Sequence, residues 1–470
     1  LGANTTANNN TAVGYNALVT NTTGSANVAV GAISLDANTT GQYNTAIGYE
    51  SLSANTTADE NTALGSFALR YNTTGGNNTA AGYKALEDNT TASNNTAFGF
   101  EALNANTTGT ANTAVGKDAL KLNTTADNNT AMGFDALEQN TTGGSNAAFG
   151  AYALASVTTG SQNTAVGRGA LSDNTGSQNT AVGYNALTSN TTASGLTAVG
   201  RRALELNTTG SNNTAVGSSA LDANTIGSRN CAFGVNSLDA NTTGNDNIGI
   251  GYLALAANTD GAENVAIGSR CLPVNTTGDR NTAVGDQALK ANTTGEHNTA
   301  MGFAALYNQT TGNRNTGLGY YALLNNTTAN DNTAVGYWAL VDNTTGHSNT
   351  AVGTYALDAC TTGSQQVAVG YKAGTAITTG TQNTIVGENA GVVVTTGDRN
   401  TLIGRDAGGQ VTTGTNNLLL GHDAGKSGSP SHIVTSNNKI VLGDNNIDGA
   451  FVKVSFTVTS DERDKTDITD

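Results

Sequence analysis

The chain has 470 residues, of which 59 are Gly, 2 are Pro and 12% are charged, and its formal net charge is −15. An ordinary globular chain is about 25% charged and about 7% Gly, and this composition argues against a coiled coil, collagen or a disordered chain. The sequence has no run of about 18 apolar residues, so we expect no membrane-spanning helix. The excess of acidic residues argues against nucleic acid as a partner.

From the N-terminus to about residue 425 the chain is one tandem repeat. A marker Gly closes each N-T-A-V-G-like segment from Gly14 to Gly421, and successive markers are 17 residues apart. The exception is the 16-residue step from Gly167 to Gly183, where one turn residue is missing at residues 174–176. The consensus reads N-T-A-V-G-Y-x-A-L-x-x-N-T-T-G-x-x, so repeats dominate the architecture.

Each repeat is too short for two helices with their turns, and N-T-T-G opposes helix. T-A-V-G-Y suits a short strand, A-L-x-x-N suits a second strand, and N-T-T-G and the x-x pair suit turns. We therefore expect an all-β fold, a parallel β-solenoid of about 25 coils over residues 1–425. Each residue type would stack on its own kind about 4.8 Å away.

Several positions in the repeat have an inward-facing pattern. The third position after the marker is mostly Ala, and the fourth is Leu from Leu18 to Leu357. The seventh is Asn in most repeats but aliphatic in others, such as Val157 and Ile377. A buried Asn is costly alone, but a ladder of them satisfies its amides from coil to coil. From Gly374 onward Gly replaces Leu in the last four repeats, which predicts a differently packed end.

The strand motif also predicts self-association. Alternation in T-A-V-G-Y places Ala and Gly on one face and Val and Tyr on the other, and a strand that is apolar on both faces is buried on both. An uncovered Val stripe along the stack would exceed the apolar patch that monomers tolerate. Association about a closed three-fold axis would cover it, so we expect a homotrimeric fibre.

The N-T-A-V-G-Y-x-A-L unit resembles the head repeat of trimeric autotransporter adhesins, which is a left-handed parallel β-roll. The adhesin repeat is shorter, so the match covers the strand motif and not the coil length. This resemblance implies an alternative identity as a bacterial trimeric adhesin at the cell surface.

The C-terminal end carries a second resemblance. Residues 426–459 are expected to form a transition segment, and residues 460–470 begin with S-D-E-R-D-K-T-D-I. That motif looks like the opening of the intramolecular chaperone domain of phage tail fibres and tailspikes, which self-cleaves after aiding folding of a trimeric fibre. The resemblance implies that Ser460 is the nucleophile at the cut and Lys465 its base, since a desolvated Lys can activate a hydroxyl. The competing interpretation is an ordinary charged tail.

Together these features favour a structural trimeric fibre of a phage or related virus, located on the virion as an extracellular appendage. Its expected partners are other copies of the chain, other virion proteins, and a host cell-surface receptor or glycan. An aromatic residue follows the marker Gly in many repeats, and it could pack between chains or bind sugars. A third alternative, ice binding, is disfavoured because the adjacent threonines of N-T-T would point in opposite directions in a strand.

The residues that could carry other chemistry are scattered. The histidines and cysteines lack metal-ligand spacing, so no metal and no cofactor are expected. No coil gathers a base, a nucleophile and an oxyanion site, so we expect no enzyme beyond self-cleavage. N-T-T is also an N-glycosylation sequon, as at Asn4 and Asn21, but an inward-facing Asn would leave a glycan no room.

Overall fold

The structure is a computed structural model that describes residues 2–426 and 433–448. The chain divides into two compact units, Leu1–Asn332 and Thr333–Asp470. Every strand in the described part is three residues long, and no helix occurs there. This confirms the predicted all-β parallel solenoid with one repeat per coil.

The first unit contains the strands β1 (Thr11–Val13), β2 (Val28–Val30), β3 (Thr45–Ile47), β4 (Thr62–Leu64), β5 (Thr79–Ala81), β6 (Thr96–Phe98), β7 (Thr113–Val115), β8 (Thr130–Met132), β9 (Ala147–Phe149), β10 (Thr164–Val166), β11 (Thr180–Val182), β12 (Thr197–Val199), β13 (Thr214–Val216), β14 (Cys231–Phe233), β15 (Ile248–Ile250), β16 (Val265–Ile267), β17 (Thr282–Val284), β18 (Thr299–Met301) and β19 (Thr316–Leu318). The second unit contains β20 (Thr333–Val335), β21 (Thr350–Val352), β22 (Val367–Val369), β23 (Thr384–Val386), β24 (Thr401–Ile403), β25 (Leu418–Leu420) and β26 (Ile440–Leu442).

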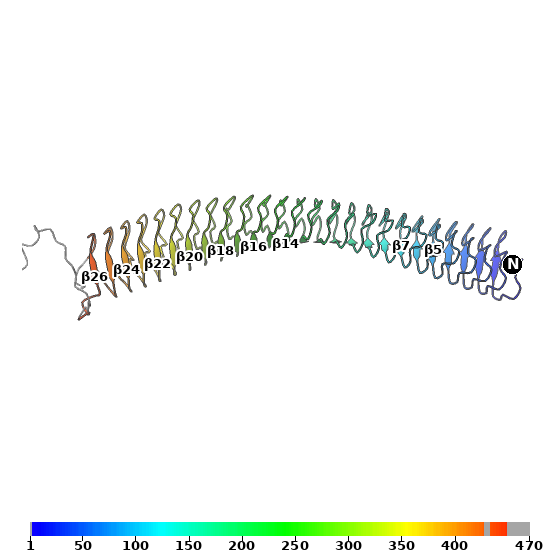
Figure 1. Ribbon diagram of the computed structural model, residues 1–470, viewed down its shortest axis with the longest axis horizontal. Coiled ribbons are helices and arrows are strands. Elements are labelled where there is room, and N and C mark those ends of the chain that lie inside the picture. The colour runs from blue at the N-terminus through cyan, green and yellow to red at the C-terminus, as the bar shows by residue number, and fades with distance from the viewer. Residues whose placement is uncertain (1, 427–432, 449–470) are drawn as a thin grey trace, which may run out of the picture. The chain divides into compact units, whose positions relative to one another are not determined.

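Within each unit the coils follow one another, and each strand pairs in parallel with the strand of the next coil (Figure 1). The register places residues of the same repeat position opposite one another, for example Ala12 opposite Ala29. The short repeat keeps this register, with Thr164 opposite Thr180, so the missing residue is absorbed in the turn as expected. β26 adds a strand that pairs with β25, within the residues 426–459 assigned to a transition segment.

The prediction of a second strand at A-L-x-x-N is wrong. That segment belongs to a turn that starts directly after the marker Gly. The second and fourth residues after the marker have left-handed backbones, as at Glu50 and Leu52, each with φ of 51°. The backbone still bonds from coil to coil, because Leu52 N–H donates to Ala68 O at 3.0 Å. A left-handed residue costs about 1–2 kcal/mol. Complete burial of the Leu side chain offsets this, since it contributes about 1.5–3 kcal/mol.

The predicted Asn ladder is confirmed. Asn38 is fully buried, and its Nδ2 donates to Asn21 Oδ1 at 2.8 Å and to Gly41 O at 3.0 Å. Where Val157 interrupts the column, the buried Oδ1 of Asn140 has no hydrogen-bond partner in the described residues. The ladder is thus a chain of donors running in one direction along the stack.

A second Asn ladder, which the sequence analysis missed, runs beside each strand. It uses the Asn that opens N-T-A-V-G. Asn44 Nδ2 donates to Ala58 O at 2.8 Å, and Asn44 N–H donates to Asn27 Oδ1 at 2.9 Å. The side chain therefore holds both the strand entry and the N-T-T-G turn, which explains why the position is nearly invariant along the chain.

The last four repeats are packed differently, as predicted, and the strand centres show how. Gly374 and Gly391 keep the left-handed backbone of the Leu position, with φ of 64° and 59°. The central strand residue, Ala in most repeats, becomes the buried Ile385 and Leu402. A Cβ on Gly391 would lie 3.0 Å from Ile385 Cδ1, so core volume has moved from the turn to the strand.

Candidate interaction surface

One face of the stack carries exposed apolar side chains, and we call it the apolar ribbon. It consists of the apolar residues directly before and directly after the marker Gly; the position after the marker is charged on four coils of the first unit, at Lys117, Arg168, Arg201 and Asp286. The ribbon residues of the first unit that are more than a third exposed before the marker are Val13, Ile47, Leu64, Phe98, Met132, Phe149, Val166, Val199, Phe233, Ile250, Ile267 and Met301. Those after the marker are Tyr15, Tyr49, Tyr83, Phe100, Phe134, Tyr184, Val235, Tyr252, Phe303 and Tyr320.

The ribbon is large for an uncovered surface. Its large side chains are roughly 40% exposed, and with about 150–200 Å² for each side chain they leave on the order of 1,500 Å² of apolar area in the first unit. The largest patch on a typical monomer is about 300–600 Å². The expectation that one strand face lines the core and the other remains to be covered therefore agrees with the exposures in a single chain.

Aromatic residues within the ribbon contact one another from coil to coil. Tyr83 and Phe100 stack with ring centroids 5.4 Å apart, and the Lys117 ammonium lies 5.0 Å from the Phe134 centroid. Such contacts fix the rings in place and add about 0.5–1.5 kcal/mol per pair. The rings still remain about two-fifths exposed, so they form a rigid and partly wetted surface.

The turn beside the ribbon is polar. Arg70 pairs with Glu50 on the preceding coil, and the Nζ of Lys84 lies 3.0 Å from Glu87 Oε2. Contacts of this kind link residues at the second and fifth positions after the marker Gly. The ribbon is therefore bordered by a row of ion pairs at these two positions, which we call the ion-paired flank. Its charged groups are more favourably solvated by water than buried against an apolar partner.

The threonines of N-T-T lie in a bend and not in a strand. Thr39 Oγ1 donates to Thr56 O at 3.0 Å, so the first Thr column is half-buried. The second, which includes Thr57, is exposed. Only one Thr column therefore faces outward, whereas the ice-binding alternative calls for a flat array of threonines. The sequon asparagines of the ladder are buried, whereas Asn4 at the end of the stack is exposed.

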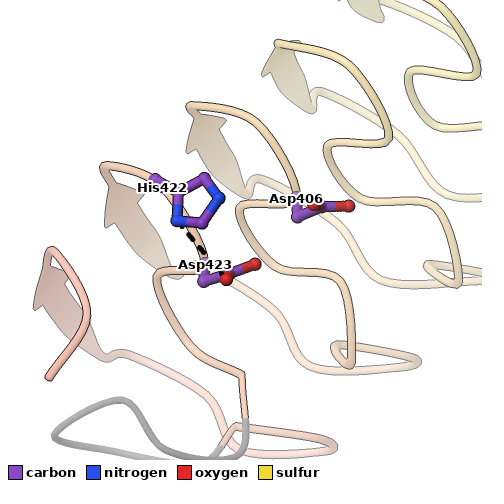
Figure 2. A group of neighbouring side chains, drawn as sticks. All are labelled: Asp406, His422 and Asp423. Carbon is purple, nitrogen blue, oxygen red and sulfur yellow. Dashed lines mark ion pairs between the residues drawn. The ribbon is translucent and has the colours of Figure 1, made fainter.

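One group in the second unit has candidate metal ligands. Single ligand atoms of Asp406, His422 and Asp423 lie within 4.8 Å of one another, and Figure 2 shows these side chains with the ion pair between His422 and Asp423. However, Lys426 Nζ lies 2.9 Å from Asp423 Oδ1 and 3.4 Å from Asp406 Oδ1, and Arg405 lies 2.7 Å from His422 Nε2. These cations neutralise the acids, so the group is an ion-pair network.

Burial disfavours the thiolate form of the three cysteines. All three are free. Burial raises the pKa of the Cys271 thiol to about 12 and that of Cys360 to about 11, and it also raises the pKa of Cys231. Cys271 occupies an Ala position and Cys360 an Asn position of the repeat. They act as core residues, since a protonated thiol is a poor nucleophile.

The predicted self-cleavage residues, Ser460 and Lys465, lie outside the described residues, so their roles stay predictions from resemblance. Within the described residues, no helix has the length and apolar character to span a bilayer. No protein-family model matches the chain, and no curated protein matches it either.

Proposed function

We propose that the chain is the shaft of a homotrimeric fibre of a phage or related virus, which projects towards the host for attachment. The observation that supports this most is the apolar ribbon on a stack whose backbone and Asn side chains bond repeatedly from coil to coil. Those bonds allow any number of coils to stack, whereas the exposed apolar ribbon must be buried against another surface.

Sister copies fit the ribbon better than an unrelated partner does. Side chains recur on it once per coil, about every 4.8 Å, so another copy with the same period can match it along its whole length if both stacks share one axis. The exposed area exceeds the roughly 800 Å² per partner of a standard stable interface. Closed rotational symmetry prevents further growth sideways, and both families that the sequence resembles are three-fold.

The ion-paired flank defines which surface stays outside. Glu50, Arg70 and Lys84 lie on the turn next to the ribbon, and their charges would be costly to desolvate. In the proposed fibre the ribbons face the axis while these flanks face water and the host. Virion proteins would contact the ends of the shaft.

Negative-stain electron microscopy of the purified chain tests the fibre directly. Thin rods of uniform width are expected, and compact globules would contradict the proposal. Matched single-charge variants identify the face that assembles. Met132→Asp, on the ribbon, should convert rods into narrower single stacks, whereas Thr57→Asp, on the exposed bend, should leave the rods unchanged.

The competing candidate is a bacterial trimeric surface adhesin, because its head repeat shares the strand motif. The C-terminus discriminates between the two. If the viral interpretation holds, mass spectrometry of the C-terminus of the expressed chain should find a cut beside Ser460, and Ser460→Ala should prevent it. A chain that stays intact, encoded with a secretion signal and membrane anchor, would favour the adhesin.

A further inference from the structure

A pocket opens on the first unit where one column of side chains is interrupted. The second position after the marker Gly is Gln287, Ala304 and Tyr321 on three successive coils. Ala304 is 2% exposed and forms the floor, because its methyl group leaves the space that its larger neighbours fill on their own coils. The pocket has a volume of about 300 Å³ and is lined by Gln287, Phe303, Ala304, Tyr307, Asn308, Tyr321 and Leu324.

The coil spacing sets the width of the pocket. Gln287 and Tyr321 are separated by two coil steps, which is about 9.6 Å between backbones. A ring that contacts a wall on both sides needs about 7 Å between wall atoms, since carbon atoms in contact are about 3.5 Å apart. The slot above Ala304 therefore admits one six-membered ring and not two stacked rings.

The walls combine aromatic rings with amide and hydroxyl groups. Phe303 and Tyr321 have centroids 5.6 Å apart and are tilted by 48°. Lys290 Nζ donates to Tyr307 Oη at 2.7 Å and to Gln287 Oε1 at 3.1 Å. Asn308 Nδ2 donates to Asn325 Oδ1 at 2.9 Å. These bonds hold the polar groups at the rim before any ligand arrives, which lowers the entropy cost of binding.

This combination matches a sugar ring. A hexopyranose has an apolar C–H face that packs on an aromatic ring and a rim of hydroxyls that bonds to amides and phenols. The tilted rings suit a puckered ring better than a flat base, which stacks between parallel planes. Phosphate is disfavoured because no Lys or Arg is among the residues that line the pocket, and the Asp286 carboxylate lies beside it, with Oδ2 accepting a bond from Gln287 at 3.3 Å.

We infer that this pocket binds one neutral hexopyranose residue of a surface glycan. The inference rests on the proposed attachment function, for which it names a ligand class and a place. The pocket opens on the flank formed by the second, fifth and sixth positions after the marker Gly. Phe303 alone belongs to the ribbon, so assembly through the ribbon leaves the mouth accessible.

Saturation-transfer NMR on the full-length chain tests this, with methyl β-D-glucopyranoside, methyl β-D-galactopyranoside and methyl α-D-mannopyranoside as probes. At least one should receive saturation, and Ala304→Leu should reduce its affinity at least tenfold by filling the slot. Leu253 occupies the same position on another coil with φ of 55°, so the variant is compatible with the fold. Ser219→Leu, at the same position of a coil that does not line this pocket, is the matched control and should bind as the parent does.

Three results would overturn the inference: no saturation of any pyranoside at millimolar concentration, unchanged binding by Ala304→Leu, or equal binding of cyclohexanol, which would reveal a merely apolar cleft. Sedimentation of the same samples separates this from the proposed function. A trimer that ignores pyranosides refutes the pocket alone, whereas a monomer that binds them refutes the fibre alone.

Discussion

Replacing one Asn in the middle of the inner ladder should weaken the stack locally and strongly. Asn55 is fully buried. Its Nδ2 donates to Asn38 Oδ1 at 3.0 Å and to Ala58 O at 3.1 Å, and its Oδ1 accepts from Asn72 Nδ2 at 3.1 Å. In Asn55→Ala these three groups lose a partner away from water.

Each buried polar group left unsatisfied costs about 1–3 kcal/mol. Asn72 Nδ2 retains its bond to Gly75 O at 2.9 Å, and Ala58 O retains the bond from Asn44 Nδ2 at 2.8 Å, so only Asn38 Oδ1 is left unsatisfied. With about 0.5–1.5 kcal/mol for each of the two other lost bonds, the expected total is about 2–6 kcal/mol. Since about 1.4 kcal/mol corresponds to a factor of ten, amides of the adjacent coils should exchange roughly 10–10⁴-fold faster.

Native-state hydrogen exchange is the appropriate assay, because unfolding of a long repeat array is not a two-state process. Faster exchange should centre on residues 38–72 and fade within a few coils. Thr57→Ala, on the exposed bend of the same coil, is the control and should change exchange little. A ladder variant that exchanges like this control would show that the amides do not hold the coils together.

Three further predictions concern single positions. Gly65→Ala should disrupt the coil and increase cleavage by protease, because at φ of 134° its Cβ would lie 2.5 Å from the carbonyl oxygen of Gly82. In the control Gly76→Ala the nearest atom to the new Cβ is Asp59 O at 3.2 Å, so this variant should express and resist protease normally. Gln309→Asn should give the unpartnered Asn292 Oδ1 a donor and thereby stabilise the adjacent coils by about 1 kcal/mol, measured by native-state hydrogen exchange; faster exchange would contradict the ladder geometry. Burial raises the pKa of Asp222 to about 6, so this carboxyl destabilises the fold at neutral pH, and stability should increase as pH falls from about 6 towards 3.8. Asp222→Asn should stabilise by about 1–2 kcal/mol at pH 7.5, allowing for partial solvent screening, and this gain should vanish near pH 4; a gain independent of pH would contradict the assignment.

The sequence predicts the coil well because every coil imposes the same conditions on the same position. The 17-residue period fixes which residues stack, so the inward positions of Leu18 and Asn21 follow from their recurrence. The exposed ribbon follows similarly from Val and Tyr alternation. The second Asn ladder was missed because Asn27 and its equivalents precede a strand, where Asn usually marks a turn.

The turn and the pocket could not be predicted from propensity. Leu52 adopts a left-handed backbone, which local preference opposes, and only the gain from burying its side chain explains it. The pocket at Ala304 depends on its neighbours 17 residues away in each direction. The signal is present in the sequence, but it becomes readable only after the coils are aligned in register.

Whether sister copies cover the apolar ribbon is tested most directly by the mass of the assembled chain in solution. Sedimentation equilibrium should give three times the chain mass of 47.2 kDa for the parent, and a smaller species when Met132 is replaced by Asp. A stable parent species of a single chain's mass, with the ribbon exposed to water, would contradict the proposed fibre.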